Sequence, residues 1–164
     1  RLSRTCRSFL LPQHQKILPQ VRKAVAQALL QSRTRPYTLV HGDLRADNLL
    51  FSRGRVFIVD WQISAWGLGA FDLARVIGGS TKRPLTLSEQ KKLVSLWHQT
   101  LRRGGVRHYT SEEAWQDYRT GVALTLSIPI TNGPVLARLS PRGKKIARLM
   151  IRRFFRNGQV FDLL

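Results

Sequence analysis

LVHGDLRADNLLFSRGRVFIVDWQISAWGLGAFD, residues 39–72, contains the candidate chemical groups of this chain, and the rest of the chain is expected to support it. Apolar runs flank a polar loop, and the second apolar run ends on an acid, Asp60. This order predicts strand, loop, strand, turn and strand, with Asp43 and Asn48 on the loop. A hairpin through residues 52–54 would bring Asn48 and Asp60 towards each other. Carboxylate and amide oxygens gathered in this way suit Mg²⁺ that is bound together with substrate phosphates.

The spacing of the loop residues is that of phosphoryl transfer. In protein kinases, a loop H-R-D-x-x-x-x-N supplies a base Asp and a metal-binding Asn, and a later D-F-G Asp holds Mg²⁺. Here His41, Asp43 and Asn48 keep that spacing, with Gly42 where those kinases have Arg. The tripeptide D-W-Q at 60–62 stands where D-F-G would be. The stretch therefore resembles the aminoglycoside phosphotransferase and choline kinase-like family of small-molecule kinases, whose loop reads H-G-D-x-x-x-x-N.

The resemblance implies roles for five residues. Asp43 would be the base or the hydroxyl-orienting residue, and Asn48 and Asp60 would be Mg²⁺ ligands. His41 would have a structural role, and Asp72 would anchor the loop from behind through hydrogen bonds. The alternative is that Asp43 and Asn48 merely form a turn while Asp60 caps a strand. That alternative explains neither the order of these residues nor their strand context.

The reaction that the resemblance implies is transfer of the γ-phosphoryl group of ATP to a hydroxyl of a small molecule, with Mg²⁺ as cofactor. Arg45 lies inside the loop and could reach a phosphate or an anionic substrate. It could also form a surface salt bridge with Asp47, and the sequence leaves both interpretations open. Few acids remain to surround a cationic acceptor once the loop residues are assigned, so we expect a neutral or anionic hydroxyl substrate.

The chain is strongly basic. It has 164 residues, a net charge of +19 and nine acids. Attraction to polyanions is expected from this charge, although no recognised nucleic-acid module argues for dedicated nucleic-acid binding. The basic last helix could mark a membrane surface or an acidic partner, or it could simply be the solvated face of a bundle helix.

The compartment is indicated by cysteine usage and hydropathy. A single cysteine, Cys6, excludes an intrachain disulfide and fits a reducing, cytoplasmic location, with the thiol as a spectator. The most apolar run, near residues 122–130, is too short to be a transmembrane segment. Residues 1–42 contain no acid and resemble a transit peptide in composition. Because the chain starts at Arg1, a fragment of a longer protein is the preferred interpretation.

Capping and turn signals predict five helices around the loop. Pro19 suits the first turn of one helix, and Thr86 and Thr110 each begin a capping box with a Glu three residues later. The pairs at 78–79 and 104–105, both Gly-Gly, are expected to end helices, and Thr-Asn-Gly-Pro at 131–134 is expected to be a turn. The expected helices span about residues 19–32, 71–77, 86–103, 110–128 and 140–158. Trp61 and Trp66 are expected to be packing residues.

The expected fold is α+β and mostly helical: the C-terminal lobe of a protein-kinase-like fold, with a small β-hairpin that carries the catalytic loop and the metal-binding Asp. One domain would contain an N-terminal segment and helix (1–36), the loop and hairpin (37–80) and a helical subdomain (81–164). A glycine-rich loop and a phosphate-binding Lys do not precede the loop, so the nucleotide-binding lobe is missing and the isolated chain is expected to be inactive. The alternative function is an inactive kinase-derived module that binds a partner or a polyanion.

Overall fold

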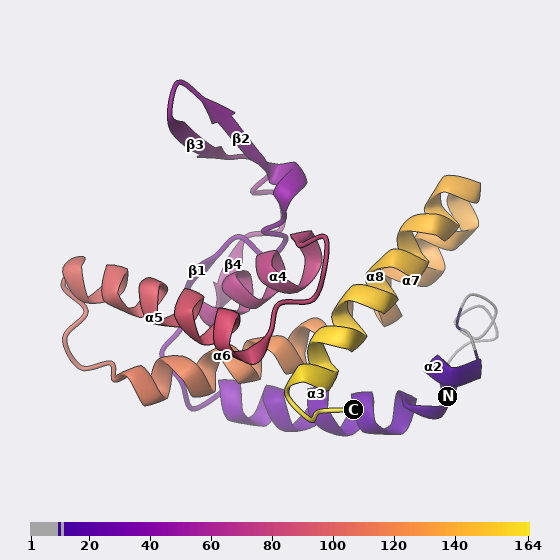
Figure 1. Cartoon of the computed structure of the whole chain (residues 1–164), viewed down its shortest axis with the longest axis horizontal. Coiled ribbons are helices and arrows are strands. Elements are labelled where there is room, and N and C mark those ends of the chain that lie inside the picture. The colour runs from indigo at the N-terminus through magenta and orange to yellow at the C-terminus, as the bar shows by residue number, and fades with distance from the viewer. Residues whose placement is uncertain (1–9, 11) are drawn as a thin grey trace.

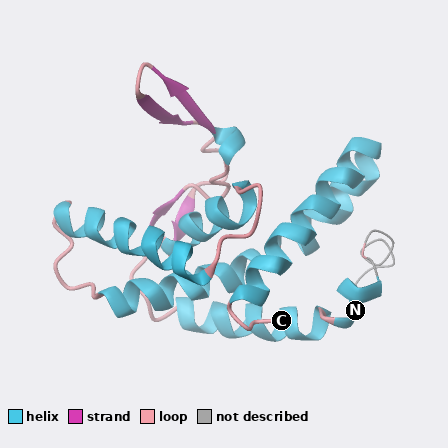
Figure 2. Cartoon of the chain, viewed as in Figure 1, coloured by secondary structure: helices cyan, strands magenta, loops and turns pink. Residues whose placement is uncertain are grey.

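Helices dominate the structure, a computed structural model that describes residue 10 and residues 12–164. Figure 1 shows their arrangement, and Figure 2 separates them from two small sheets. This confirms the α+β, mostly helical class. Cys6 and the basic segment before it lie outside the described residues. In chain order, the elements are α2 (Pro12–Lys16), α3 (Leu18–Ser32), β1 (Thr38–Val40), η1 (Ala46–Asn48), β2 (Leu49–Ser52), β3 (Arg55–Ile58), β4 (Ala65–Gly67), α4 (Ala70–Ser80), α5 (Leu87–Arg103), α6 (Ser111–Thr125), α7 (Ile128–Leu139) and α8 (Pro141–Val160).

The expected hairpin is formed by β2 and β3. Ser52 pairs with Arg55, so Arg53 and Gly54 are the two turn residues. Both have positive φ, 47° and 73°, as in the type I′ turn whose twist matches that of the strands. The hairpin projects away from the helices (Figure 1), and every side chain of its strands except that of Leu49 is exposed. Its apolar side chains therefore have little cover from the described part of the chain.

The strand that leads into the loop, β1, does not join this hairpin. It pairs with β4 in a second antiparallel sheet, with Leu39 opposite Trp66. The sequence predicts only loop for residues 62–70, which is wrong for the three residues of β4. A three-residue strand is too short to show an alternating pattern, and its partner lies more than twenty residues away in the sequence.

The helical core is built around α6, which packs against α3, α4, α5 and α8. Tyr118 of α6 is fully buried, and its hydroxyl donates to Gln90 Oε1 of α5 at 2.6 Å. The Nε2 of Gln90 in turn donates to Asn157 Oδ1 of α8 at 2.9 Å. Because buried polar groups are costly unless paired, this network favours one relative arrangement of the three helices.

Helical structure occupies two places where the sequence predicts a turn or a helix end. Residues 131–134 lie inside α7, with Pro134 in the helix interior, so the expected turn is wrong. This helix packs along α8, and the backbone of Leu136 lies so close to Gly143 that a Cβ would not fit there. Helix α4 likewise runs through Gly78-Gly79 to Ser80 because Gly78 packs directly against Phe154. In both cases tertiary packing outweighs weak local propensity.

The ends of α3 and α5 and both capping boxes agree with the sequence-based predictions. Their buried faces agree less well. In α5, Leu93 and Leu96 are exposed, whereas Gln90 and Val94 are buried. In α3, the helical spacing of Val21, Val25, Ala28 and Leu29 predicts one buried apolar stripe, but Leu29 is exposed. Within the part of the chain that the structure describes, no helix has both the length and the apolar character needed to cross a membrane.

Candidate functional site

Asp72 anchors the start of the loop that carries Asp43 and Asn48. It lies in the first turn of α4, and its carboxylate accepts hydrogen bonds from two consecutive backbone amides. His41 N donates to Oδ2 at 2.6 Å, and Gly42 N donates to Oδ1 at 3.0 Å. Hydrogen bonds to a carboxylate are stronger than those between neutral groups. The start of the loop is therefore tied to the start of α4.

The His41 side chain joins the loop to the residue that follows β3, at the base of the hairpin. Its ring is 2% exposed. Nδ1 accepts from the backbone N–H of Asp43 at 3.2 Å, so Nε2 carries the proton and donates to Val59 O at 2.8 Å. The ring of Trp61 lies 4.8 Å from the His41 ring, centroid to centroid. One buried imidazole thus sets the position of the Asp43 backbone relative to the residue just before Asp60.

Gly42 is required by the backbone of the loop. Its φ is +83°, a region that residues with a Cβ avoid. A Cβ built at this position would lie 2.7 Å from the backbone oxygen of Ile63. The close approach of residue 63 to the loop therefore leaves room only for glycine between His41 and Asp43.

Asp43 is half-buried and faces two arginines. Its Oδ1 accepts from Arg75 Nη2 at 2.6 Å, and its Oδ2 lies 3.5 Å from Arg45 Nε. Arg75 is only 5% exposed, and its guanidinium carbon lies 5.1 Å from the ring centroid of Phe154. Burial lowers the pKa of Arg75, and the charge of Asp43 opposes that shift.

Arg75 is a site residue that the sequence-based prediction missed. A signal was present, because Arg75 is the one charged residue on α4 besides Asp72, and it follows Asp72 by three positions. Residues three apart lie on the same side of a helix. An arginine in an otherwise apolar helix, one turn after the anchoring acid, could have been assigned to the loop.

Asn48 and Asp60 are brought to adjacent positions across the hairpin. The backbone oxygen of Asn48 accepts from Val59 N at 3.0 Å, so Asp60 follows directly after this pairing. The Asn48 side chain is buried, and its Nδ2 donates to Asp43 O at 2.9 Å, which turns its Oδ1 away from that carbonyl. Asp60 is exposed, has a φ of +68°, and makes no hydrogen bond or ion pair within the described residues. An amide oxygen and an unpaired carboxylate fit the oxygen ligands that Mg²⁺ takes.

Arg45 lies between two acids of the same loop. Besides its 3.5 Å approach to Asp43, its Nη2 lies 3.4 Å from Asp47 Oδ2. Its side chain is 40% exposed, so these ion pairs are screened by solvent and contribute little to stability. The salt bridge with Asp47 is present, and the guanidinium also stays within reach of a ligand at Asp43.

The surface next to the site is apolar and exposed. Trp61 and Trp66 are 44% and 74% exposed, so Trp66 is not the packing residue that the sequence suggests. Patches of this kind mark surfaces that contact another molecule or domain. Further exposed apolar side chains on β1 and the hairpin are Leu39, Leu50, Phe51, Val56, Phe57 and Ile58.

Comparisons with known proteins place this chain in a family. Residues 5–116, more than half of the chain, match the family described as "Phosphotransferase enzyme family". Methylthioribose kinases from three strains of Bacillus cereus are each 28% identical over 104 residues, which cover 56% of this chain and 26% of the relative. The chain thus spans about a quarter of the length of these curated relatives. No solved structure matches. The match over the loop, the hairpin and the following helices shows that this chain belongs to the phosphotransferase enzyme family.

Proposed function

We propose that this chain is the catalytic lobe of an ATP-dependent phosphotransferase that transfers the γ-phosphoryl group to a hydroxyl of a small molecule. The observation that carries the proposal is the buried His41 imidazole. It bonds to the backbone of Asp43 on one side and to Val59, next to Asp60, on the other. A turn and a strand cap without function would not need this connection. The kinase names of the curated relatives support the same reaction class.

In this proposal each side chain of the candidate site has a defined role. Asp43 accepts or orients the proton of the acceptor hydroxyl, and Arg75 holds its carboxylate in one orientation through Oδ1. Asn48 and Asp60 hold Mg²⁺, which neutralises phosphate charge when it is bound. Asp72 and His41 keep these groups in place. Positioning and electrostatics carry most of the catalysis in such a reaction.

The acceptor is proposed to be neutral or anionic. A cationic acceptor would need free carboxylates, and most acids of this chain have partners. Asp117 and Glu113 both pair with Arg35, and Glu89 pairs with Arg83. Asp43 is engaged by Arg75, and Asp72 by the loop amides. Against a net charge of +19, the remaining acids are too few to surround a polycation.

The nucleotide-binding lobe is proposed to lie against the exposed hairpin. An isolated two-stranded hairpin is marginally stable in water, and this one exposes Phe51 to 75% and Phe57 to 49%. A second lobe that covers these side chains would bury apolar area and complete the phosphate site. The chain alone is therefore expected to fold but to show no ATP turnover.

A second candidate function is a kinase-derived module that binds a polyanion without catalysis. The sequence of α8 favours it, since this helix has seven Lys and Arg residues and no acid. Binding to polyanions without any affinity for Mg·ATP would support this candidate over the kinase.

The experiment that tests the kinase is a turnover assay of the complete gene product with ATP, Mg²⁺ and a panel of neutral, anionic and cationic alcohols. Asp43→Asn should lower kcat by roughly 10²–10⁴-fold with nucleotide binding nearly unchanged. Asp60→Ala should weaken the dependence of activity on Mg²⁺. Near-normal turnover by the Asp43→Asn enzyme would show that Asp43 is not the catalytic base. Mg-dependent phosphorylation by the 164-residue chain alone would show that no second lobe is needed.

A further inference from the structure

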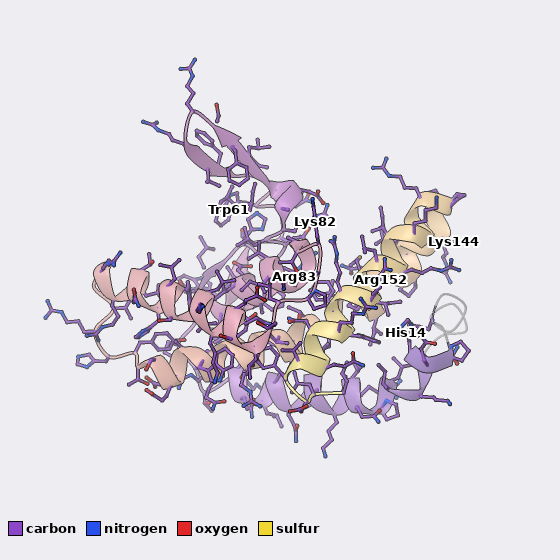
Figure 3. The ribbon with its side chains drawn as sticks, in the orientation of Figure 1. His14, Trp61, Lys82, Arg83, Lys144 and Arg152 are labelled. Carbon is purple, nitrogen blue, oxygen red and sulfur yellow. The ribbon has the colours of Figure 1, made fainter. Side chains whose placement is uncertain are left out.

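Two neighbouring cavities line one side of α8. The first, about 200 Å³, lies between α8 and the segment 81–85 that follows α4. The second, about 660 Å³, lies between α8 and α2. Both are lined by Leu149, Arg152 and Arg156, so they are two parts of one concave surface, which we call the basic groove. Figure 3 shows Lys82 and Arg83 on one side of it, His14 on another and Arg152 on α8 between them.

The basic groove carries only positive charge. Of the residues that the structure describes, no Asp or Glu lines either cavity. Arg83 is neutralised by a bidentate pair with Glu89, but five of the other cations have no ion pair or hydrogen bond within the described residues. The cations that line the groove are Lys82, Arg83, Lys145, Arg148, Arg152, Arg153 and Arg156.

The cations on α8 form a row that matches a ligand with more than one anionic group. Lys145, Arg148, Arg152 and Arg156 are three or four residues apart and therefore lie along one face of the helix. At 1.5 Å per residue the row is about 16 Å long. Like charges at this spacing repel one another, and a bound oxyanion would remove that repulsion.

Arg153 adds a further positive charge to the groove. One terminal nitrogen of its guanidinium donates to Gly79 O, whereas its Nε is buried and has no hydrogen-bond partner in the described part of the chain. Leaving a charged donor buried without a partner is costly. Arg153 also lines the first cavity, so its positive charge adds to the attraction for an oxyanion there.

The cavities favour a small ligand over a nucleic acid. Their volumes are of the order of those of small-molecule pockets, and in the first cavity cations from the 81–85 segment face cations from α8. Single-stranded nucleic acids are bound with exposed aromatic side chains on which bases stack. Among the described residues, Phe155 is the only aromatic side chain besides His14 that lines the groove, and it is 3% exposed.

The groove is attached to the loop that carries Asp43. Gly79, whose carbonyl accepts from Arg153, precedes Ser80, and Ser80 Oγ accepts from Ala46 N of the loop at 2.8 Å. Lys82 follows two residues later and lines the first cavity. We propose that the basic groove binds a small molecule with at least two oxyanion groups, phosphate or carboxylate. This inference rests on the proposed function: the molecule in the groove is the phosphoryl acceptor. Its anionic part lies in the basic groove while its hydroxyl faces Asp43.

The test measures binding to the 164-residue chain by isothermal titration calorimetry, without Mg²⁺ or ATP. The probes are tripolyphosphate, citrate and a single-stranded oligoribonucleotide, each at low and moderate salt. The groove variant is Arg152→Gln/Arg156→Gln, which replaces two exposed side chains. The matched control is Arg22→Gln/Lys23→Gln on α3, which loses the same charge but lines neither cavity. Circular dichroism checks that both variants are folded.

We expect saturable binding of tripolyphosphate or citrate, weakened about tenfold or more in the groove variant and little in the control. A preference between the two probes identifies phosphate or carboxylate as the group that is recognised. Equal weakening in both variants would mean attraction to net charge alone and would overturn the proposal. Binding of the oligoribonucleotide without binding of either small anion would overturn it in favour of nucleic acid.

A second measurement separates this inference from the proposed function. Asp43→Asn should leave anion binding to the groove unchanged. If the kinase proposal proved wrong, the groove would therefore still be an anion-binding site. In the complete gene product, the groove variant should raise KM for an anionic acceptor about tenfold with kcat nearly unchanged. An unchanged KM would show that the occupant is not the acceptor.

Discussion

Arg75 Nη2 donates to Asp43 Oδ1 at 2.6 Å, and the same guanidinium lies over the ring of Phe154 at 5.1 Å. The orientation of the loop carboxylate therefore depends on Phe154 of α8, which lies more than a hundred residues after Asp43 in the sequence. Because the guanidinium is buried, it has little freedom to move while it holds Asp43. The geometry of the site around Asp43 therefore depends on how α4 and α8 pack against each other.

Substitution of Arg75 by Gln in the complete gene product tests this contact. Asp43 would keep its charge but lose the group that orients it, and misplacement by about 1 Å can cost roughly 10²-fold in rate. We expect kcat to fall by that order with KM for ATP nearly unchanged, as measured by steady-state kinetics. Arg119→Gln, at an exposed position of α6, is the control. Unaltered kcat in Arg75→Gln would contradict the positioning role.

Two glycines with positive φ provide a matched pair for stability. Gly42→Ala should lower the free energy of unfolding by about 2 kcal/mol or more, because it combines an unfavourable φ of +83° with a contact to Ile63 O. Gly54→Ala has a similar φ of +73° but open space around its Cβ, so about 1 kcal/mol is expected. Urea unfolding of the 164-residue chain measures both. Equal effects would mean that the close approach of residue 63 is unimportant.

The ion pair at the edge of the basic groove predicts a pH dependence. Hydrogen bonds from Arg83, and then from Thr86 N, lower the pKa of Glu89 to about 2. Because this pKa is lower in the folded chain than in the unfolded one, the pair stabilises the fold above the ordinary Glu pKa of about 4.3 and is lost as pH falls towards 2. Carboxyl ¹³C NMR should show Glu89 still ionised near pH 3. In Arg83→Gln its titration should move upward, and an unmoved titration would contradict the pairing.

Because the hairpin is exposed, we expect Phe51→Ser to change the free energy of unfolding less in the 164-residue chain than in the complete gene product. In the 164-residue chain, Phe51→Ser should change the free energy of unfolding by less than about 0.5 kcal/mol, because Phe51 is exposed. In the complete gene product, a nucleotide lobe over the hairpin would make the same change cost about 1–3 kcal/mol. Phe154→Ala, at a buried position, should cost about 3–5 kcal/mol in both. Equal, small effects of Phe51→Ser in both contexts would argue against a covering lobe.

Much of the site region followed from short-range order in the sequence. The hairpin was predicted because two apolar runs flank a turn that contains glycine, and the capping boxes were predicted because Thr and Glu recur at the spacing that closes them. The breaks expected at Gly78-Gly79 and Pro134 were wrong because helix α8 packs against both regions. Local propensity cannot include the free energy of a contact with a helix that comes later in the chain.

The residues of the loop could be picked out from the sequence alone, since the order and spacing of His41, Asp43 and Asn48 resemble the H-G-D-x-x-x-x-N loop of small-molecule kinases. The contacts that hold these residues became apparent only from the three-dimensional arrangement of the chain. Arg75 reaches Asp43 across 32 residues, and β1 takes β4 as its partner instead of the hairpin. The basic groove likewise exists only because α8 lies next to both the 81–85 segment and α2. Periodicity and spacing report neighbours within one element, whereas these features depend on which distant elements share a buried surface.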